Sequence, residues 1–131
     1  MNVVAYGGGT NSTAMLIGMH EKGIPVDLIL FDDPGSEQPY TYEYLPIMDD
    51  WLARHGMPHI QTVYCTDKNG DRLTLEQECL RSGTLPAIAY GYKKCSLKHK
   101  IVPQEKFCNH YPPCQEVWAR GEKVFKYIGY D

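Results

Sequence analysis

The sequence predicts an α/β fold, with a doubly wound, mostly parallel, Rossmann-like sheet in a three-layer α/β/α arrangement. Strand-like apolar runs alternate with helix-like segments along the first half of the chain, which is the order of a parallel sheet with crossover helices. The run VDLILF at 26–31 is apolar throughout, as in strands that are covered on both faces. The chain has 131 residues, 43% of them hydrophobic, and no linker or internal repeat, so we expect a single domain spanning residues 1–131.

Each expected element has a local reason. The apolar segment 2–6 precedes three glycines, and a helix over 11–22 ends at Gly23, which Pro25 follows. A second helix over 40–55 carries apolar side chains at helical spacing. The remaining expected elements are strands at 26–31, 60–65 and 123–130 and helices at 73–82 and 101–110, with an irregular, basic stretch over 84–100.

Composition and charge bear on the partners of the protein, its location and the state of its cysteines. The net charge of −3 does not favour a nucleic acid such as tRNA as a partner. No apolar run approaches the roughly 20 residues of a membrane span, and the N-terminus lacks the layout of a signal peptide, so we expect a cytoplasmic protein with no membrane partner. The five cysteines have no regular spacing, which favours reduced thiols over a disulfide framework.

The segment AYGGGTNSTAML at 5–16 joins a strand to a helix through a glycine turn. Ligands of open parallel sheets bind at the carboxyl ends of the strands, and glycines there let the backbone approach a phosphate closely. The helix N-terminus adds backbone N–H groups and a partial positive charge. The segment therefore predicts a phosphate-binding loop formed by Gly7, Gly8, Gly9, Thr10, Asn11 and Ser12.

A dinucleotide site is one interpretation of this loop. Gly7 and Gly9 match the first half of the G-x-G-x-x-G pattern, and Asp32 follows the second strand, where an acidic residue binds a ribose. Ser12 stands in place of the third glycine, so the pattern is incomplete. This interpretation predicts a small oxidoreductase that depends on a nicotinamide dinucleotide.

A pyrophosphate loop is the second interpretation, and it accounts for more residues. GGGTNS at 7–12 resembles the S-G-G-x-D-S segment of the adenine nucleotide alpha-hydrolase-like (PP-loop) superfamily. Gly8, Gly9 and Ser12 match that segment. Gly7 replaces its serine, and Asn11 replaces its aspartate and removes a carboxylate from the loop.

Later segments resemble one branch of that superfamily, the phosphoadenosine phosphosulfate (PAPS) reductases. FDDPGSEQPYTYEYL at 31–45 is similar to the branch's D-T-G-x-x-x-P-x-T-Y-x-Y segment. KKCSLKHKIVP at 93–103 is similar to its C-T/S-x-x-x-K-x-x-P segment, and YIGYD at 127–131 to the start of its late strand. The segments follow one another in the order of the branch and extend over most of the chain.

The resemblance implies an adenine nucleotide, ATP or PAPS, as the ligand, together with Mg²⁺ where the ligand requires it. It implies that Asp32 lies beside the ribose, the adenine or a bound Mg²⁺, and that Lys98 and Lys100 neutralise a terminal phosphate or sulfate. The enzymes that it implies are a PAPS reductase-like oxidoreductase with a thiol reductant, or a nucleotidyl transferase that uses ATP. A partner chain or an oligomer that completes the site is compatible with both.

The sequence departs from the branch at the expected nucleophile. PAPS reductases use a cysteine near the C-terminus, whereas this chain ends at Asp131, directly after a strand-like run. We therefore expect either a small natural protein or a fragment of a longer one. Cys95 is the candidate catalytic residue that would replace the nucleophile. The same departures favour a nucleotide-binding module without catalytic activity as an alternative.

Other side chains leave further alternatives open. Cys95, Cys108 and Cys114, with His110, are candidate ligands of an iron–sulfur cluster or of zinc, although the five residues between Cys108 and Cys114 are not a usual zinc spacing. His99 lies in the basic segment and is the histidine that we select for testing. The aromatic residues expected to pack the second helix are Tyr40, Tyr42, Tyr44 and Trp51.

Overall fold

The computed structural model describes residues 1–85 and 97–129. Its strands are β1 (Asn2–Tyr6), β2 (Leu28–Asp32), β3 (Ile60–Val63) and β4 (Phe125–Ile128). Its α-helices are α1 (Thr10–Glu21), α2 (Pro39–Arg54), α3 (Leu75–Ser82), α5 (Val102–His110) and α6 (Pro112–Ala119). A short π-helix, η2 (Leu97–Ile101), leads directly into α5. Among these described helices, none is long and apolar enough to cross a membrane.

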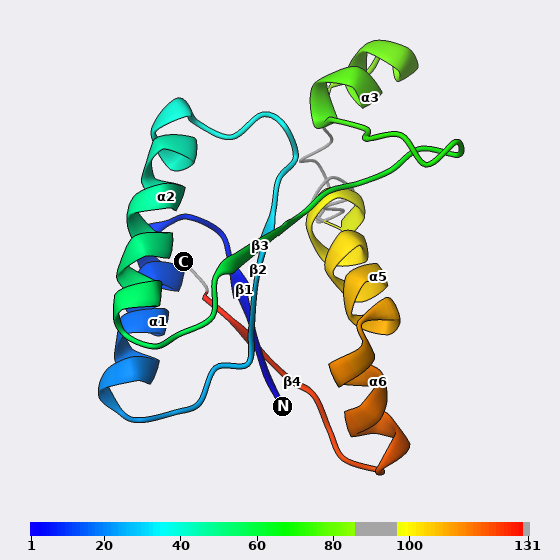
Figure 1. Cartoon of the computed structure of the whole chain (residues 1–131). Helices are drawn as coiled ribbons and strands as arrows, with labels where there is room; N and C mark the ends of the chain where they lie inside the picture. Colours follow the sequence, from blue (N-terminus) through cyan, green and yellow to red (C-terminus); the bar gives the residue numbers. More distant parts are fainter. Residues whose placement is uncertain (86–96, 130–131) are drawn as a thin grey trace.

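The four parallel strands of the described residues form one sheet in the order β3-β2-β1-β4. The chain adds β2 and β3 on one side of β1, and β4 on the other side. This reversal creates a switch point between β1 and β4, and open parallel sheets bind ligands outside the carboxyl ends of the strands at such a point. Helices α1 and α2 lie on one side of the sheet, and α5 and α6 on the other (Figure 1). The architecture is α/β and is consistent with a Rossmann-like fold, as predicted.

Each face of the sheet buries its own apolar cluster. The cluster toward α1 and α2 consists of Val4, Tyr6, Leu16, Met19, Ile29, Phe31, Met48 and Leu52. The cluster on the other face consists of Val3, Leu28, Leu30 and Val63, with Phe107 and Tyr111 of the α5 region packed against it. Because successive strand residues point to opposite faces, β1 and β2 need apolar side chains at nearly every position. This explains the unbroken apolar run that predicted β2.

Most expected elements are confirmed, with boundaries shifted by one or two residues. The third and last strands are shorter than predicted, since β3 ends at Val63 and β4 spans only Phe125–Ile128. The stretch 84–100 is not irregular throughout, because η2 begins at Leu97. Helix α6 is not among the elements predicted from the sequence, although Pro112 and Pro113 occupy its first turn, where proline is well tolerated.

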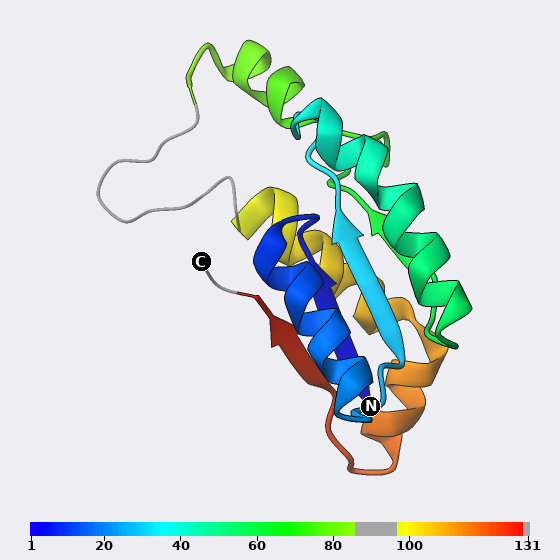
Figure 2. The same cartoon turned by 90° about the vertical axis from the view of Figure 1, so that its left-hand side faces the viewer.

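A glycine lets β4 approach α1 at the switch point. Gly129 follows β4, and a Cβ added to it would lie 2.9 Å from the backbone nitrogen of Ser12 and 3.0 Å from its Cα. Both atoms belong to the backbone of the first turn of α1, which side-chain rotation cannot move. The contact therefore ties the end of β4 to the start of α1, as both views of the fold indicate (Figure 2).

We expect Gly129→Ala to lower the free energy of unfolding by about 1–3 kcal/mol, the usual cost of forcing a methyl group into a packed site. The matched control is Gly18→Ala within α1, where an added Cβ meets nothing within 4 Å. That control should keep or raise the stability, because alanine favours a helix more than glycine does. Urea denaturation of the three proteins measures the difference. Equal stability of the wild type and Gly129→Ala would contradict the close approach of β4.

Candidate functional site

The glycine turn lies at the carboxyl end of β1, next to the switch point. Residues 7–9 connect Tyr6 of β1 to Thr10, the first residue of α1. Gly8 has a φ of 75°, and a Cβ added to it would lie 2.7 Å from Cγ2 of Thr41 in α2. Glycine is therefore required here both by the backbone conformation and by the approach of α2. This contact also brings together the segments 7–12 and 31–45, on which the family resemblance depends.

Hydroxyl groups of α1 hold the turn in shape. Ser12 Oγ accepts a hydrogen bond from the Gly7 N–H at 3.2 Å and donates one to the Gly9 carbonyl at 3.3 Å. Thr13 Oγ1 donates to the same carbonyl at 2.8 Å. Ser12 is 6% exposed. Its hydroxyl thus serves the conformation of the turn, and the phosphate contact that the sequence assigns to Ser12 stays a prediction.

The N-terminus of α1 opens onto the surface of the protein. Thr10 and Asn11 are exposed there, and so are Gly7 and Gly9. The first N–H groups of any α-helix lack partners within the helix and give its N-terminus a partial positive charge. The first turn of α1 contains no acidic side chain that would offset this charge. The loop residues predicted from the sequence are therefore together, and they form a surface suited to an anion.

Asp32 lies beside the turn, because β2 pairs with β1 up to Phe31 and Tyr6. It is 5% exposed, and its Oδ2 accepts a hydrogen bond from Nε2 of Gln104 in α5, which is 6% exposed. The other oxygens of this pair, Asp32 Oδ1 and Gln104 Oε1, are buried and have no hydrogen-bond partner among the described residues. Unpaired buried acceptors are costly, so Asp32 Oδ1 and Gln104 Oε1 require a hydrogen-bond donor that the described residues do not supply.

Burial raises the pKa of Asp32 to about 7, although the hydrogen bond from Gln104 and the charges of Lys126 and Lys100 lower it. The carboxyl group therefore changes its charge near neutral pH. In its protonated form it donates a hydrogen bond, and in its ionised form it only accepts. Carboxyl groups whose pKa is shifted by burial are frequent at functional sites.

The two predicted lysines lie on η2 and pair with different helices and loops. Lys100 Nζ lies 3.3 Å from Glu37 Oε1 in the loop between β2 and α2, and its charge also acts on Asp32. Lys98 Nζ contacts Glu78 of α3 and lines a separate hollow of about 470 Å³ with Lys68 and Arg81 among its other walls. The structure thus associates Lys100 with the predicted site and directs Lys98 toward α3.

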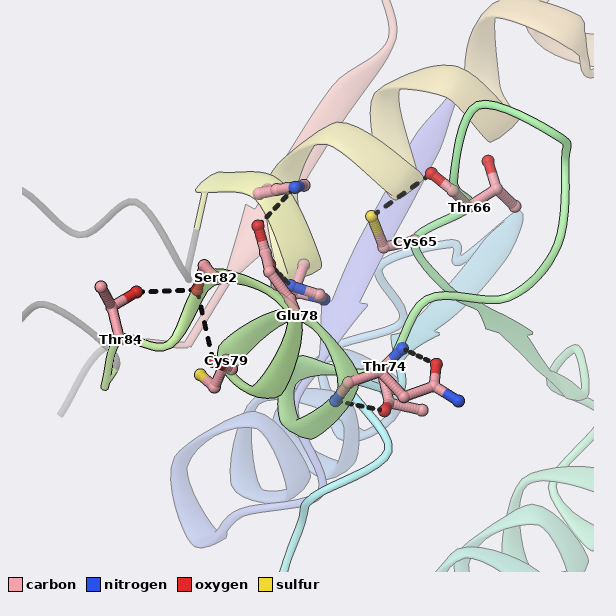
Figure 3. Close-up of polar contacts among 10 residues, drawn as sticks. Cys65, Thr66, Thr74, Glu78, Cys79, Ser82 and Thr84 are labelled. Atoms are coloured by element: carbon pink, nitrogen blue, oxygen red, sulfur yellow. Dashed lines mark hydrogen bonds and ion pairs between the residues drawn. The ribbon is translucent and has the colours of Figure 1, made fainter.

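Glu78 joins α3 to η2 (Figure 3). Its two carboxylate oxygens contact Lys98 Nζ and His99 Nε2. Partial burial raises the pKa of Glu78, but the hydrogen bonds from Lys98 and His99 outweigh it and bring the pKa below its ordinary value. His99 is 1% exposed, and its Nδ1 has no hydrogen-bond partner in the described part of the chain. The buried His99 side chain therefore helps to hold η2 against α3 through its contact with Glu78.

Asp33 holds the loop between β2 and α2. Its Oδ1 accepts hydrogen bonds from the Gly35 N–H at 2.8 Å and from the Tyr42 hydroxyl at 2.6 Å, and its Oδ2 pairs with Arg72 at 2.6 Å. Partial burial raises the pKa of Asp33, but these contacts outweigh it and lower the pKa. Tyr42 thus serves the loop. The prediction that Tyr40 packs α2 is wrong, because that side chain is 68% exposed.

The candidate cysteines of α5 and α6 lie away from the glycine turn. Cys95, the candidate nucleophile, lies outside the described residues. Cys108 is partly buried on α5, and Cys114 is fully buried on α6. Within the described ranges, no three His, Cys, Asp or Glu side chains gather into a metal-binding group. The iron–sulfur or zinc site that the sequence left open also includes Cys95, so it stays a prediction.

Sequence reasoning missed Gln104, which is the partner of Asp32. The two residues are 72 positions apart, and no spacing along the chain relates them. It also missed Glu37 and Glu78, the acidic partners of the two lysines. The available signal for Gln104 was Asp32 itself, an aspartate at the end of an apolar strand. A carboxyl group that is buried there requires a hydrogen-bond partner.

The chain matches no protein-family model, and searches among curated proteins and solved structures find no significant match. Inference about function therefore depends on the geometry of this site and on the resemblance of the segments that form it.

We expect Asp32 to make the protein less stable as the pH rises from about 4 to 7. The unfolded carboxyl group ionises near 3.9 and the folded one near 7, so between these values the folded state holds a proton that the unfolded state has released. The raised pKa of Asp32 lowers the free energy of unfolding by about 1–4 kcal/mol, and this loss reaches its full size above the folded pKa. Asp32→Asn removes this loss.

Urea denaturation between pH 4 and pH 8 measures the effect. The stability of Asp32→Asn relative to the wild type should be higher at pH 8 than at pH 4. Asp50→Asn is the control, because the Asp50 side chain is 66% exposed on α2 and pairs only at the surface. Parallel pH profiles of Asp32→Asn and the wild type would contradict the assignment.

Proposed function

We propose that this protein binds an adenine nucleotide at the carboxyl end of its sheet, with the phosphates at the turn formed by residues 7–12. The observation that carries the proposal is the position of the α1 N-terminus near the end of β2, where two buried acceptor oxygens, Asp32 Oδ1 and Gln104 Oε1, have no donor among the described residues. A nucleotide has groups for both. Its phosphate oxygens accept hydrogen bonds from backbone N–H groups, and its ribose hydroxyls and adenine amino group donate them.

Different parts of the site bind different parts of the nucleotide. The phosphate oxygens accept from the backbone around Gly8 and Gly9 and from the first turn of α1. The ribose hydroxyls donate to Asp32 and Gln104. Lys100 adds positive charge near Asp32, and its ion pair with Glu37 is exposed enough to be weak and to exchange for a phosphate oxygen.

The family resemblance narrows the class of nucleotide to ATP or a sulfonucleotide such as PAPS. As part of the proposal, we assign the fold to the three-layer, Rossmann-like domains of the adenine nucleotide alpha-hydrolase-like superfamily, next to the PAPS reductases. The order of the resembling segments supports this assignment, and so does the packing of Gly8 from the first segment against Thr41 from the second. Mg²⁺ enters with ATP, because it is usually bound through phosphates and one or two carboxylates.

Thermal unfolding with a panel of ligands tests the proposal. The panel contains ATP, AMP, PAPS, adenosine 3′,5′-bisphosphate and NAD, each with and without Mg²⁺. A ligand at a hundredfold excess over its Kd stabilises the folded state by about 2.7 kcal/mol, so the melting temperature should rise by several degrees. Stabilisation by PAPS and the bisphosphate would select a sulfonucleotide, and stabilisation by ATP with Mg²⁺ would select ATP. A shift with NAD alone, or with no member of the panel, would overturn the proposal.

Gly9→Ala tests the position of the phosphates. Gly9 has a φ of −94°, which any residue adopts, and a Cβ added to it meets nothing within 4 Å. The unliganded variant should therefore melt as the wild type does. We expect it to bind the nucleotide at least tenfold more weakly, a loss of about 1.4 kcal/mol, because the methyl group occupies the space of the phosphates.

Gly18→Ala is again the matched control, since it adds the same methyl group to α1 away from the turn and should keep the affinity of the wild type. Titration calorimetry with the nucleotide selected by the panel measures all three proteins. Undiminished affinity of Gly9→Ala would place the phosphates elsewhere.

A further inference from the structure

Three sulfur-containing side chains lie near one another at the end of the sheet opposite the glycine turn. Met1 precedes β1, and its Sδ lies 3.7 Å from Cys114 Sγ of α6. Only Tyr111 separates α5 from α6, and this short connection brings Cys108 of α5 next to Cys114. Both views of the fold show the N-terminal end of the chain beside α6 (Figures 1 and 2).

The two thiols are close enough to act on each other. Burial raises the pKa of Cys114 to about 11, and the neighbouring Cys108 thiol adds to this effect. Burial also raises the pKa of Cys108, against a hydrogen bond with Cys114 and the charge of Lys126, which lower it. The empty cluster therefore consists of two protonated thiols and a thioether. Each is a weak hydrogen-bonding group, and none carries a charge.

The donor set selects a particular class of ligand. Zinc takes four ligands from cysteine, histidine and carboxylate side chains, and the described residues do not gather such a group here. A set of two thiolates and one thioether favours a soft ion such as Cu(I). With metal–sulfur bonds of about 2.3 Å, three sulfurs around one ion in a plane lie roughly 4 Å apart. The 3.7 Å between Met1 Sδ and Cys114 Sγ is close to that spacing.

We propose that Met1, Cys108 and Cys114 form a three-sulfur binding site for Cu(I). This inference does not depend on nucleotide binding, because the cluster lies at the other end of β1. Binding converts both thiols to thiolates and releases two protons, while neither the copper nor the sulfur changes its oxidation state. The two thiolates and the Cu(I) ion together carry a net charge of −1. Lys126 of β4 acts on Cys108, against Glu105 of α5, and the N-terminal ammonium group of Met1 acts on Cys114.

Access and burial both suit a tightly held ion. Cys114 is 0% exposed and Val117, one turn further along α6, is 6% exposed, so water is excluded from the inner side of the cluster. Cys108 and Met1 are partly buried, which leaves an entry from the surface. A soft ion in a dry, sulfur-lined position is held against exchange with water and oxygen ligands.

Anaerobic titration with Cu(I), in competition with the chromophoric chelator bicinchoninate, tests the site in the whole chain. We expect the wild type to withdraw one Cu(I) from the chelator. Cys108→Ser should weaken binding at least a hundredfold, and Cys114→Ser should do the same. Cys114→Ala is the second variant at this buried position, for use where serine prevents folding. Cys65→Ser and Cys79→Ser are matched controls that should bind as the wild type does.

Two outcomes of the titration overturn the proposal. One is wild-type affinity in Cys108→Ser, which is the more exposed of the two thiol positions and should tolerate serine. The other is equal loss in the control variants, which would indicate non-specific binding to thiols. Lower affinity at pH 6 than at pH 8 is also expected, because two protons must leave; binding that is independent of pH would contradict the release of both.

X-ray absorption at the copper edge tests the part played by Met1. We expect three sulfur neighbours at about 2.3 Å, the usual length of a metal–thiolate bond. In protein grown with selenomethionine, one of these neighbours should become selenium. Two sulfur neighbours with no selenium, or nitrogen and oxygen neighbours, would overturn the three-sulfur site.

Discussion

Burial of β1 and β2 on both faces is the constraint on which the rest of this structure depends. All five residues of β2 are buried, and Val3, Val4 and Tyr6 of β1 are at most 1% exposed. Two strands that are apolar on both sides require helices against each face, and parallel strands require crossover connections that supply them. The positions of α1, α2 and α5 follow from this requirement, and so do the places where the chain must turn at the carboxyl ends of the strands.

The candidate site lies at the carboxyl end of the sheet, where the buried part of β2 ends. Asp32 is the last residue of β2 and remains within the covered part of the sheet, so its carboxyl group is desolvated and its pKa is raised to about 7. Gln104 satisfies only one of its oxygens, and the amide oxygen of Gln104 is also unpaired among the described residues. Next to this pair, the glycine turn ends β1 without any side chain. Polar groups that lack partners among the described residues thus lie near backbone that carries no side chain.

Two acidic residues determine which way the lysine side chains of η2 point. Glu78 holds Lys98 and His99 toward α3, and Glu37 holds Lys100 toward the loop between β2 and α2. The two lysines are about half exposed, and ion pairs near the surface contribute little to stability, but these two pairs determine which lysine lies near Asp32. The sulfur cluster at the opposite end of β1 also depends on how separate elements are brought together. The short connection between α5 and α6 and the start of β1 bring three soft side chains to one place.

Local patterns in the chain predicted the α/β class, the order of most elements and the position of the glycine turn. Apolar periodicity, glycine and proline act over a few residues, so they can be recognised without the fold. The acidic partners of Lys98 and Lys100, the exposure of Tyr40 and the role of Ser12 within the turn could not be predicted, because they depend on how helices rotate against the sheet. The pairing of Asp32 with Gln104 and the approach of Met1 to Cys114 also required the tertiary structure. These side chains are far apart in sequence, and they meet only because packing the two faces of the sheet brings their helices and strands together.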